Sequence, residues 1–210
     1  MKILIVGGRP ITTWPSLGTY DYYIGIDRGA LHLLEAKIPC DAAIGDFDSL
    51  SELEQMKVFE YASLVKQSPP EKDDTDTQLG LLHALTIEST AEITLIGLTG
   101  GRIDHFLANL WLPLEPRFRS YCRQFKLVDQ QNIITFFEPG QYTISKEPDM
   151  RYLAYCCLTP VTDLTLAESK YTLQNVDVMY PLSYASNEFL TDTALLSFKS
   201  GMIAVIQSKD

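Results

Sequence analysis

Short apolar runs alternate with amphipathic stretches through the first half of the chain. Continuous apolar runs of this length are typical of strands buried on both faces, and they cover residues 2–6, 22–26, 42–44, 63–65 and 93–98. Apolar residues at helical spacing lie between these runs, over residues 30–36, 75–87 and 104–112. Because strands and helices alternate, the pattern predicts a Rossmann-like α/β domain with a mainly parallel sheet.

The pattern changes after a connector over residues 113–125, in which Pro113 and Pro116 act as helix breakers. Closely spaced strands follow, separated by turn signals such as Pro139-Gly140, and we expect them over residues 133–137, 142–144, 152–158, 161–166, 193–198 and 202–207. Such spacing predicts an antiparallel β-sandwich. The sequence therefore indicates two domains, an α/β domain over residues 1–128 and an all-β domain over residues 129–210.

Composition and charge narrow the class of protein. The chain has 210 residues, of which 46% are hydrophobic and 21% charged, which is typical of a folded globular protein. Its formal net charge is −10, with −8 carried by residues 1–113 and −2 by the rest. Nucleic acids and anionic membranes bind basic surfaces, so we expect neither as a partner.

The remaining bulk features favour a cytoplasmic protein. The apolar run after Met1-Lys2 is too short for a signal peptide, and no later run reaches the length of a membrane span. The four cysteines lack the spacing of a zinc site, and we expect them to be buried and reduced. The three histidines form no Ser-His-Asp or Cys-His pattern, so phosphoryl-type chemistry is favoured over acyl transfer.

Aspartates follow several of the predicted strands at the point where each ends. The carboxyl ends of parallel strands meet at one edge of a sheet, where ligands of such domains bind. Four separate loops should deliver acidic side chains to this edge, and their acids are Asp27, Asp46, Asp48, Asp73, Asp74, Asp76 and Asp104.

The segment Gly45-Asp46-Phe47-Asp48-Ser49 has two readings. If it is extended, Asp46 and Asp48 lie on one side while Phe47 points to the core, and paired carboxylates suit Mg²⁺. The same residues could equally form an Asx turn or a cap before the helical sequence Ser51-Glu52-Leu53-Glu54.

The acids of residues 71–78 precede a predicted helix, whose N-terminus favours negative charge. Capping would explain one Asp or Thr75, but Asp73, Asp74 and Asp76 together repel one another unless a cation lies among them. Lys72 is either a solvated charge or a phosphate contact beside this cluster. The sequence favours a functional cluster over simple capping.

Gly100-Gly101 lies between a predicted strand and a predicted helix, where free backbone N–H groups can hold phosphate oxygens. Arg102 can add its guanidinium fork to the same anion. This loop is neither a Walker A nor a dinucleotide-binding motif, so alone it is a weak signal. His105 either contacts phosphate or packs beside Asp104, and a structural role is favoured for it.

Taken in order, four segments resemble the thiamin pyrophosphokinase family. They are Ile26-Asp27-Arg28-Gly29-Ala30, Ile44-Gly45-Asp46-Phe47-Asp48-Ser49-Leu50, Lys72-Asp73-Asp74-Thr75-Asp76 and the stretch from Thr99 to Asn109. The resemblance extends to the C-terminal half through Ser169 to Asn175, Ser186 to Leu190 and Phe198 to Gly201. Two positions depart from the family pattern: Arg28 replaces a frequent glycine, and Glu168-Ser169 replaces Gly-Leu.

The resemblance implies transfer of a pyrophosphoryl group from Mg-ATP to the thiamin hydroxyl, with thiamin diphosphate and AMP as products. It also implies a homodimer with active sites at the subunit interface. On this analogy, Mg²⁺ binds Asp46, Asp48, Asp73 and Asp76, which with Arg102 are the expected catalytic residues. The expected nucleotide contacts are Asp27, Lys72, Thr75, Gly100, Gly101, Arg102, Asp104 and His105, and the expected thiamin contacts are Tyr171, Ser186 and Asn187.

Two alternatives remain at this point. The first is another Mg²⁺-dependent phosphate enzyme, either a nucleotide hydrolase or a pyrophosphokinase for a different heterocyclic alcohol. The second is a non-catalytic sensor of thiamin or nucleotide on the same scaffold. Intact clustering of the aspartates favours an enzyme, since clustered like charges cost stability unless a ligand uses them.

Overall fold

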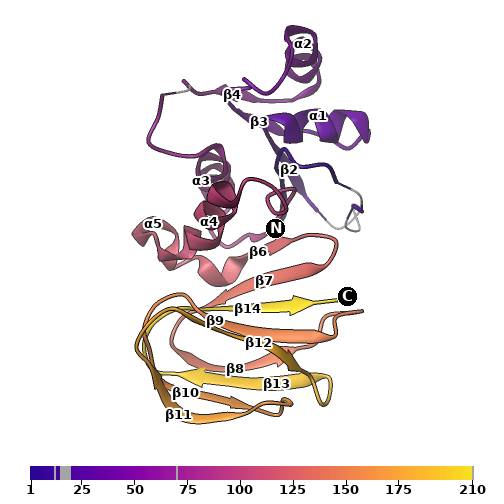
Figure 1. Ribbon diagram of the computed structural model, residues 1–210. Coiled ribbons are helices and arrows are strands. Elements are labelled where there is room, and N and C mark those ends of the chain that lie inside the picture. The colour runs from indigo at the N-terminus through magenta and orange to yellow at the C-terminus, as the bar shows by residue number, and fades with distance from the viewer. Residues whose placement is uncertain (12, 15–19, 70, 210) are drawn as a thin grey trace. The chain divides into compact units, whose positions relative to one another are not determined.

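The computed structural model describes residues 1–11, 13–14, 20–69 and 71–209. The chain divides into two compact units (Figure 1). Unit 1 comprises Met1–Leu112 and Leu127–Gln130, and unit 2 comprises Pro113–Lys126 and Gln131–Asp210. Among the described residues, no helix is long and apolar enough to cross a lipid bilayer.

Unit 1 is an α/β fold with a parallel sheet, as the sequence predicts. The described strands pair in the order β5-β1-β2-β3-β4, and all four of these pairs are parallel. The strands are β1 (Lys2–Val6), β2 (Tyr22–Ile26), β3 (Ala42–Gly45), β4 (Val65–Gln67) and β5 (Glu92–Ile96). The helices are α1 (Arg28–Glu35), α2 (Glu52–Tyr61), α3 (Asp76–Ile87) and α4 (Ile103–Trp111).

Helices cover both faces of this sheet, which explains why its central strands are continuous apolar runs. On one face, Leu4 and Val6 of β1 join a buried cluster with Leu33 of α1 and Val58 of α2. On the other face α3 approaches closely at Gly80, where a Cβ atom would lie 2.7 Å from the Ile26 side chain. The sheet therefore holds the loops after its strands in fixed positions.

Unit 2 is a β-sandwich of two antiparallel sheets, again as predicted (Figure 1). In one layer of the sandwich the strands of this unit lie in the order β12-β9-β14-β7, and the other layer is the four-stranded sheet β11-β10-β13-β8. Their bounds are β7 (Asn132–Phe137), β8 (Gly140–Ser145), β9 (Tyr152–Cys157), β10 (Val161–Ala167), β11 (Leu173–Val178), β12 (Leu182–Glu188), β13 (Thr193–Phe198) and β14 (Ile203–Ser208). Buried side chains of both sheets form one cluster, which includes Tyr155, Leu164, Leu196 and Val205.

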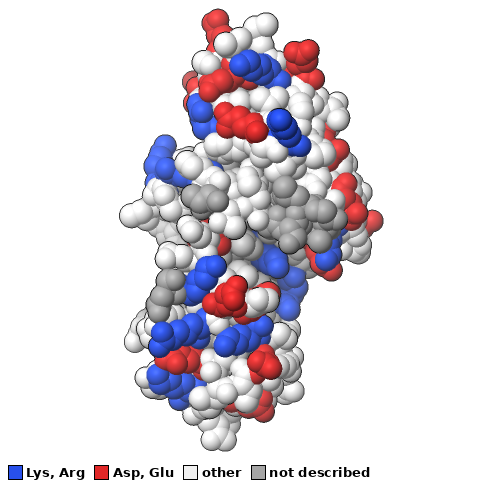
Figure 2. Space-filling model, turned by 90° about the vertical axis from the view of Figure 1, so that its right-hand side faces the viewer, with Lys and Arg blue, Asp and Glu red and all other residues white. Residues whose placement is uncertain are grey.

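Short helical segments and one strand connect these elements. They are η2 (Leu112–Leu114), α5 (Pro116–Arg119), η3 (Cys122–Gln124) and β6 (Phe125–Val128), and residues of β6 belong to both units. On the face that Figure 2 shows, basic side chains lie among acidic ones in both units.

Several predicted elements were wrong or missing. The sequence predicted a strand over residues 63–65, but β4 covers Val65–Gln67 and so begins where the predicted strand ends. The strand β5 ends at Ile96 rather than at residue 98. The sequence did not predict α2 as a full helix, because only Val58 of this helix is buried and its apolar periodicity is weak. Strands β11 and β12 were also missed, since most of their residues are at least partly exposed and bulges interrupt their alternation.

Candidate active site

Three aspartates from different loops meet at the carboxyl edge of the unit 1 sheet. Asp27 follows β2, Asp46 follows β3, and Asp76 begins α3. One carboxylate oxygen of each lies within 4.8 Å of the others. The structure thus brings together three of the acids that the sequence placed at this edge, and hard cations such as Mg²⁺ prefer oxygen ligands of this kind.

The backbone around Asp27 is built to hold its carboxylate inward. Asp27 has a positive φ of 47°, and its Oδ1 atom accepts a hydrogen bond of 3.1 Å from the Phe47 N–H. Gly45 provides the necessary space, because a Cβ atom there would lie 1.9 Å from Oδ1 of Asp27. Burial and the nearby Asp76 carboxylate raise the pKa of Asp27 to about 7.

The segment after β3 is a turn rather than the extended strand that one reading of the sequence required. Phe47 is fully buried, as predicted, but it adopts a φ of 60°, and the Asp48 N–H donates to Oδ1 of Asp46 over 3.0 Å. Asp46 therefore belongs to the carboxylate cluster and also forms an Asx-type turn. Asp48 is exposed and does not join the three clustered carboxylates, but like them it lines a pocket at this edge of the sheet.

Lys72 lies among the clustered acids. Its Nζ atom is 2.6 Å from Oδ1 of Asp76 and 3.8 Å from Oδ2 of Asp46, and it donates to the Ser68 hydroxyl over 2.8 Å. The Lys72 side chain is only 14% exposed. The ammonium group therefore neutralises part of the local negative charge, and it is not a freely solvated lysine.

Thr75 and its neighbours build the start of α3. The Thr75 hydroxyl accepts from the Gln78 N–H, and the Gln78 side chain accepts from the Thr75 N–H, which completes a capping box. Thr75 also lines the pocket, as does Asp74. Asp73 is exposed and lies outside both the pocket lining and the carboxylate cluster.

The loop before α4 has the conformation that its glycines permit. Gly100 has a φ of 70° with open space around it, and Gly101 and Arg102 line the pocket together with His105. Arg102 forms a two-pronged ion pair with Asp104 at 3.2 and 2.5 Å, and this pair lowers the pKa of Asp104. Both side chains are largely exposed, so the ion pair is weak enough for Arg102 to leave Asp104 and bind another anion.

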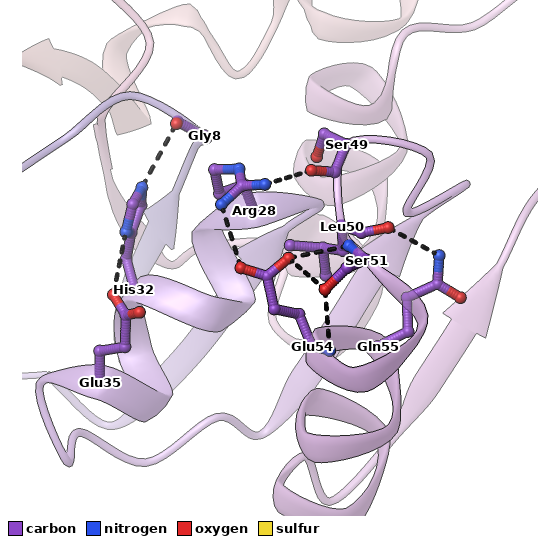
Figure 3. Close-up of polar contacts among 9 residues, drawn as sticks. All are labelled: Gly8, Arg28, His32, Glu35, Ser49, Leu50, Ser51, Glu54 and Gln55. Carbon is purple, nitrogen blue, oxygen red and sulfur yellow. Dashed lines mark hydrogen bonds and ion pairs between the residues drawn. The ribbon is translucent and has the colours of Figure 1, made fainter.

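Arg28, which stands where a glycine is frequent in the family that the sequence resembles, contacts two neighbouring segments (Figure 3). From the first turn of α1, its guanidinium donates to the Ser49 carbonyl and lies 3.5 Å from Glu54 of α2. Glu54 in turn completes a capping box with Ser51. Arg28 thereby ties the turn that carries Asp46 and Asp48 to the start of α1 and α2.

These residues surround a pocket of about 480 Å³ that lies wholly within unit 1. The residues that line it are Gly8, Arg9, Ile26, Asp27, Arg28, Asp46, Asp48, Ser49, Lys72, Asp74, Thr75, Asp76, Thr77, Gly97, Leu98, Gly101, Arg102, His105 and Asn109. The sequence did not identify Arg9, Ser49 or Asn109 as site residues. Asn109 is buried and donates to the Leu98 carbonyl over 3.2 Å, a contact that no local motif reveals.

The predicted thiamin contacts lie in unit 2 and differ in accessibility. Tyr171 is 58% exposed, with Nζ of Lys170 5.6 Å from its ring centroid, and Ser186 is exposed with a φ of 60°. Asn187 is only 2% exposed. Its amide accepts from the Tyr171 N–H over 2.9 Å and donates to the Tyr171 carbonyl over 2.8 Å and to Ser169, so it fixes the backbone of Tyr171.

Comparisons with known proteins agree with these features. Residues 15–123 match the family model described as thiamin pyrophosphokinase, catalytic domain, and residues 141–203 match the vitamin B1 binding domain of the same enzymes. A thiamine pyrophosphokinase of Bacillus subtilis is 36% identical over 99% of both chains.

Solved structures of related chains show the same fold. A thiamin pyrophosphokinase family protein from Enterococcus faecalis is 59% identical, with full coverage of both chains and a TM-score of 0.97. The Candida albicans thiamin pyrophosphokinase shares the fold at 17% identity, with a TM-score of 0.82 over 100% of this chain and 89% of that one. The matches cover nearly the whole chain, and the chain therefore belongs to the thiamin pyrophosphokinase family.

Proposed function

We propose that this thiamin pyrophosphokinase binds ATP and Mg²⁺ in the unit 1 pocket and transfers the pyrophosphoryl group to the hydroxyl of thiamin. The products are thiamin diphosphate and AMP. The observation that carries this proposal is the cluster formed by Asp27, Asp46 and Asp76, which lies in the region that matches the catalytic domain of the family.

The cluster fits a divalent cation on its own chemistry. Three carboxylates supply hard oxygen ligands, and the raised pKa of Asp27 reports repulsion and burial that a bound cation would relieve. We assign Mg²⁺ to these three residues. Asp48 and Asp73, which the resemblance also implies as Mg²⁺ ligands, lie outside the cluster of three carboxylates. When bound, Mg²⁺ neutralises phosphate oxygens and orients them for transfer.

The pocket's own side chains supply the remaining functions. Lys72 and Arg102 donate to phosphate oxygens and stabilise charge that develops as the bond between the β-phosphorus and the α–β bridging oxygen breaks. The thiamin oxygen forms the new bond to the β-phosphorus and AMP leaves with the bridging oxygen, while the hydroxyl proton passes to an acidic side chain that lines the pocket and holds no cation. Gly100 and Gly101 offer backbone N–H groups to the nucleotide, beside Asp104 and His105.

Thiamin recognition is assigned to unit 2, within the region that matches the vitamin B1 binding domain. Exposed Tyr171 offers an aromatic face for the cationic heteroaromatic ring of thiamin, and Ser186 offers a hydroxyl. We propose that Asn187 acts indirectly, by holding Tyr171 in place through its buried amide. The homodimer with interfacial active sites, the domain boundary at residue 128 and the cytoplasmic location stay predictions.

The test is to incubate the pure protein with ATP, thiamin and Mg²⁺ and to measure nucleotide and thiamin products. We expect AMP and thiamin diphosphate to appear together and to disappear on chelation of Mg²⁺. Asp46→Asn should remove the activity while the protein stays folded, and the exposed Asp149→Asn serves as the matched control. Release of inorganic phosphate would indicate a hydrolase, and ATP binding without transfer would indicate another acceptor or a sensor.

A further inference from the structure

Three of the four Lys and Arg side chains that are known to line the pocket form ion pairs with acidic side chains. Arg28 pairs with Glu54, Lys72 with Asp76 and Arg102 with Asp104. Arg9 lines the same pocket from the loop after β1. Within the described part of the chain, none of the ion pairs involves the Arg9 guanidinium. Among the residues that the structure describes, the Arg9 guanidinium therefore has no anionic partner, and its permanent positive charge lines the pocket.

The backbone of Arg9 is held in place by the end of β5. The Gly7 N–H donates to the Ile96 carbonyl over 2.8 Å, and the Arg9 N–H donates to the Gly97 carbonyl over 3.1 Å. These bonds extend the contact between β1 and β5 beyond the ends of both strands. Gly97 adopts a φ of 69° at this crossing, where a Cβ atom would lie 2.7 Å from the Gly7 carbonyl oxygen. Arg9 therefore starts from an ordered position.

The guanidinium of Arg9 occupies the space beside Gly101. A Cβ atom on Gly101 would lie 1.8 Å from Nη2, 2.0 Å from Nε and 2.1 Å from Cζ of Arg9. Any larger residue at position 101 would therefore displace the guanidinium. Gly101 belongs to the loop that is proposed to hold phosphate, so Arg9 lies beside the proposed path of the polyphosphate.

We infer that Arg9 is a nucleotide-binding residue whose guanidinium donates to phosphate oxygens of ATP, and that Gly101 keeps the space in which it does so. This inference rests on the proposed function. A guanidinium fork matches the geometry of phosphate oxygens and stays charged at every physiological pH. It also offsets the repulsion between the polyphosphate and the aspartates of the same pocket.

The first test compares Arg9→Gln with Arg9→Lys in steady-state kinetics. Loss of a hydrogen-bonded charge should raise the KM for ATP about 10- to 100-fold, and the KM for thiamin should stay within about twofold. Arg9→Lys should recover part of the loss, because it keeps the charge without the fork. Arg119→Gln removes another exposed arginine, in unit 2, and serves as the control. An unchanged KM for ATP in Arg9→Gln, or an equal rise for thiamin, would overturn the inference.

The second test asks whether Gly101 acts through Arg9. Gly101→Ala should raise the KM for ATP in the wild-type background and have little further effect in the Arg9→Gln background, since residues that act through one contact are not additive. Fully additive effects would contradict the shared role.

Calorimetric titration of each variant with ATP in the presence of Mg²⁺ separates this inference from the proposed function. If the wild-type protein bound ATP but made no thiamin diphosphate, the proposed transfer would fail. The inference on Arg9 would then be decided by the ATP affinity alone, which should fall by the same factor in Arg9→Gln. An equal affinity for both proteins would reject it.

Discussion

The Nζ atom of Lys72 lies 2.6 Å from Oδ1 of Asp76, so an ammonium group is placed directly beside the proposed cation site. The two side chains are 14% and 18% exposed, which makes the pair stronger than a solvent-exposed ion pair. Lys72 partly neutralises the carboxylate cluster before a cation or nucleotide binds.

Replacing Lys72 by Gln should therefore destabilise the metal-free protein by about 1 to 3 kcal/mol, the range for a hydrogen bond to a charged group. Addition of Mg²⁺ should recover part of this loss, because the cation neutralises the same acids. Thermal unfolding with chelator and with Mg²⁺ measures both effects. Lys57→Gln, on the exposed side of α2, is the control, and equal unfolding temperatures for the two variants would contradict the role of Lys72.

A methyl group on Gly45 should disturb the site through Asp27. The added Cβ atom would lie 1.9 Å from Oδ1 of Asp27, so Gly45→Ala must move the carboxylate and should lower Mg²⁺-dependent turnover at least about 100-fold. Stability should also fall, since Gly45 has a φ of 151°. In an Asp27→Ala background the methyl group has more room, and the cost in unfolding free energy should shrink. The same cost in both backgrounds would exclude this explanation.

The raised pKa of Asp27 predicts a pH dependence with a definite sign. Its pKa of about 7 lies above the ordinary value of 3.8, so unfolding releases a proton between about pH 4 and pH 7. The contribution of Asp27 to metal-free stability is therefore full at low pH and falls as the pH rises through this window. Each pKa unit corresponds to about 1.4 kcal/mol.

Asp27→Asn removes this titration and keeps an oxygen that can accept from the Phe47 N–H. In chelator, the variant should gain stability over the wild type as the pH rises from 5 to 8, by on the order of 2 kcal/mol. Its Mg²⁺ affinity should fall, whereas the wild-type affinity should increase with pH up to about 7. Urea unfolding at both pH values measures the first effect, and parallel profiles would refute the assignment.

Two capping boxes in unit 1 allow a matched comparison. Thr75 caps α3 and lines the pocket, whereas Ser51 caps α2 and does not line it. Thr75→Ala and Ser51→Ala should each cost about 1 kcal/mol of stability. Only Thr75→Ala should raise the KM for ATP, because it alone shifts the first turn of α3 that carries Asp76. An equal change of KM in both variants would show that the effect is one of general stability.

Asn187 should affect the binding of thiamin indirectly, by holding the backbone of Tyr171 in place. Asn187→Asp keeps the acceptor for the Tyr171 N–H but loses the donor to the Tyr171 carbonyl, so the loop should loosen. We expect a stability loss of about 1 to 3 kcal/mol and a rise in the KM for thiamin, with the KM for ATP unchanged. Steady-state kinetics with each substrate varied in turn gives the answer. A larger effect on ATP than on thiamin would argue against this role.

The sequence by itself determined the two fold classes and the edge at which the acids gather. Strands such as β1 are apolar on both faces because helices cover both sides of the sheet, and this leaves a continuous apolar run that can be read directly. The parallel-sheet rule then placed Asp27, Asp46 and Asp76 near one another without any coordinates. Strands with mixed exposure, such as β11 and β12, carry no such pattern and were missed.

Only the tertiary structure decided which acids converge and which side chains act through others. The positive φ values of Asp27 and Phe47 direct their side chains in a way that residue spacing does not encode, which separates Asp48 from the clustered carboxylates. Asn187 became buried, and Arg9 came to lie beside Gly101, through contacts between segments far apart in the chain. Local patterns record the periodicity of burial, whereas side-chain direction and long-range neighbours depend on backbone conformation and packing that form only when the chain folds.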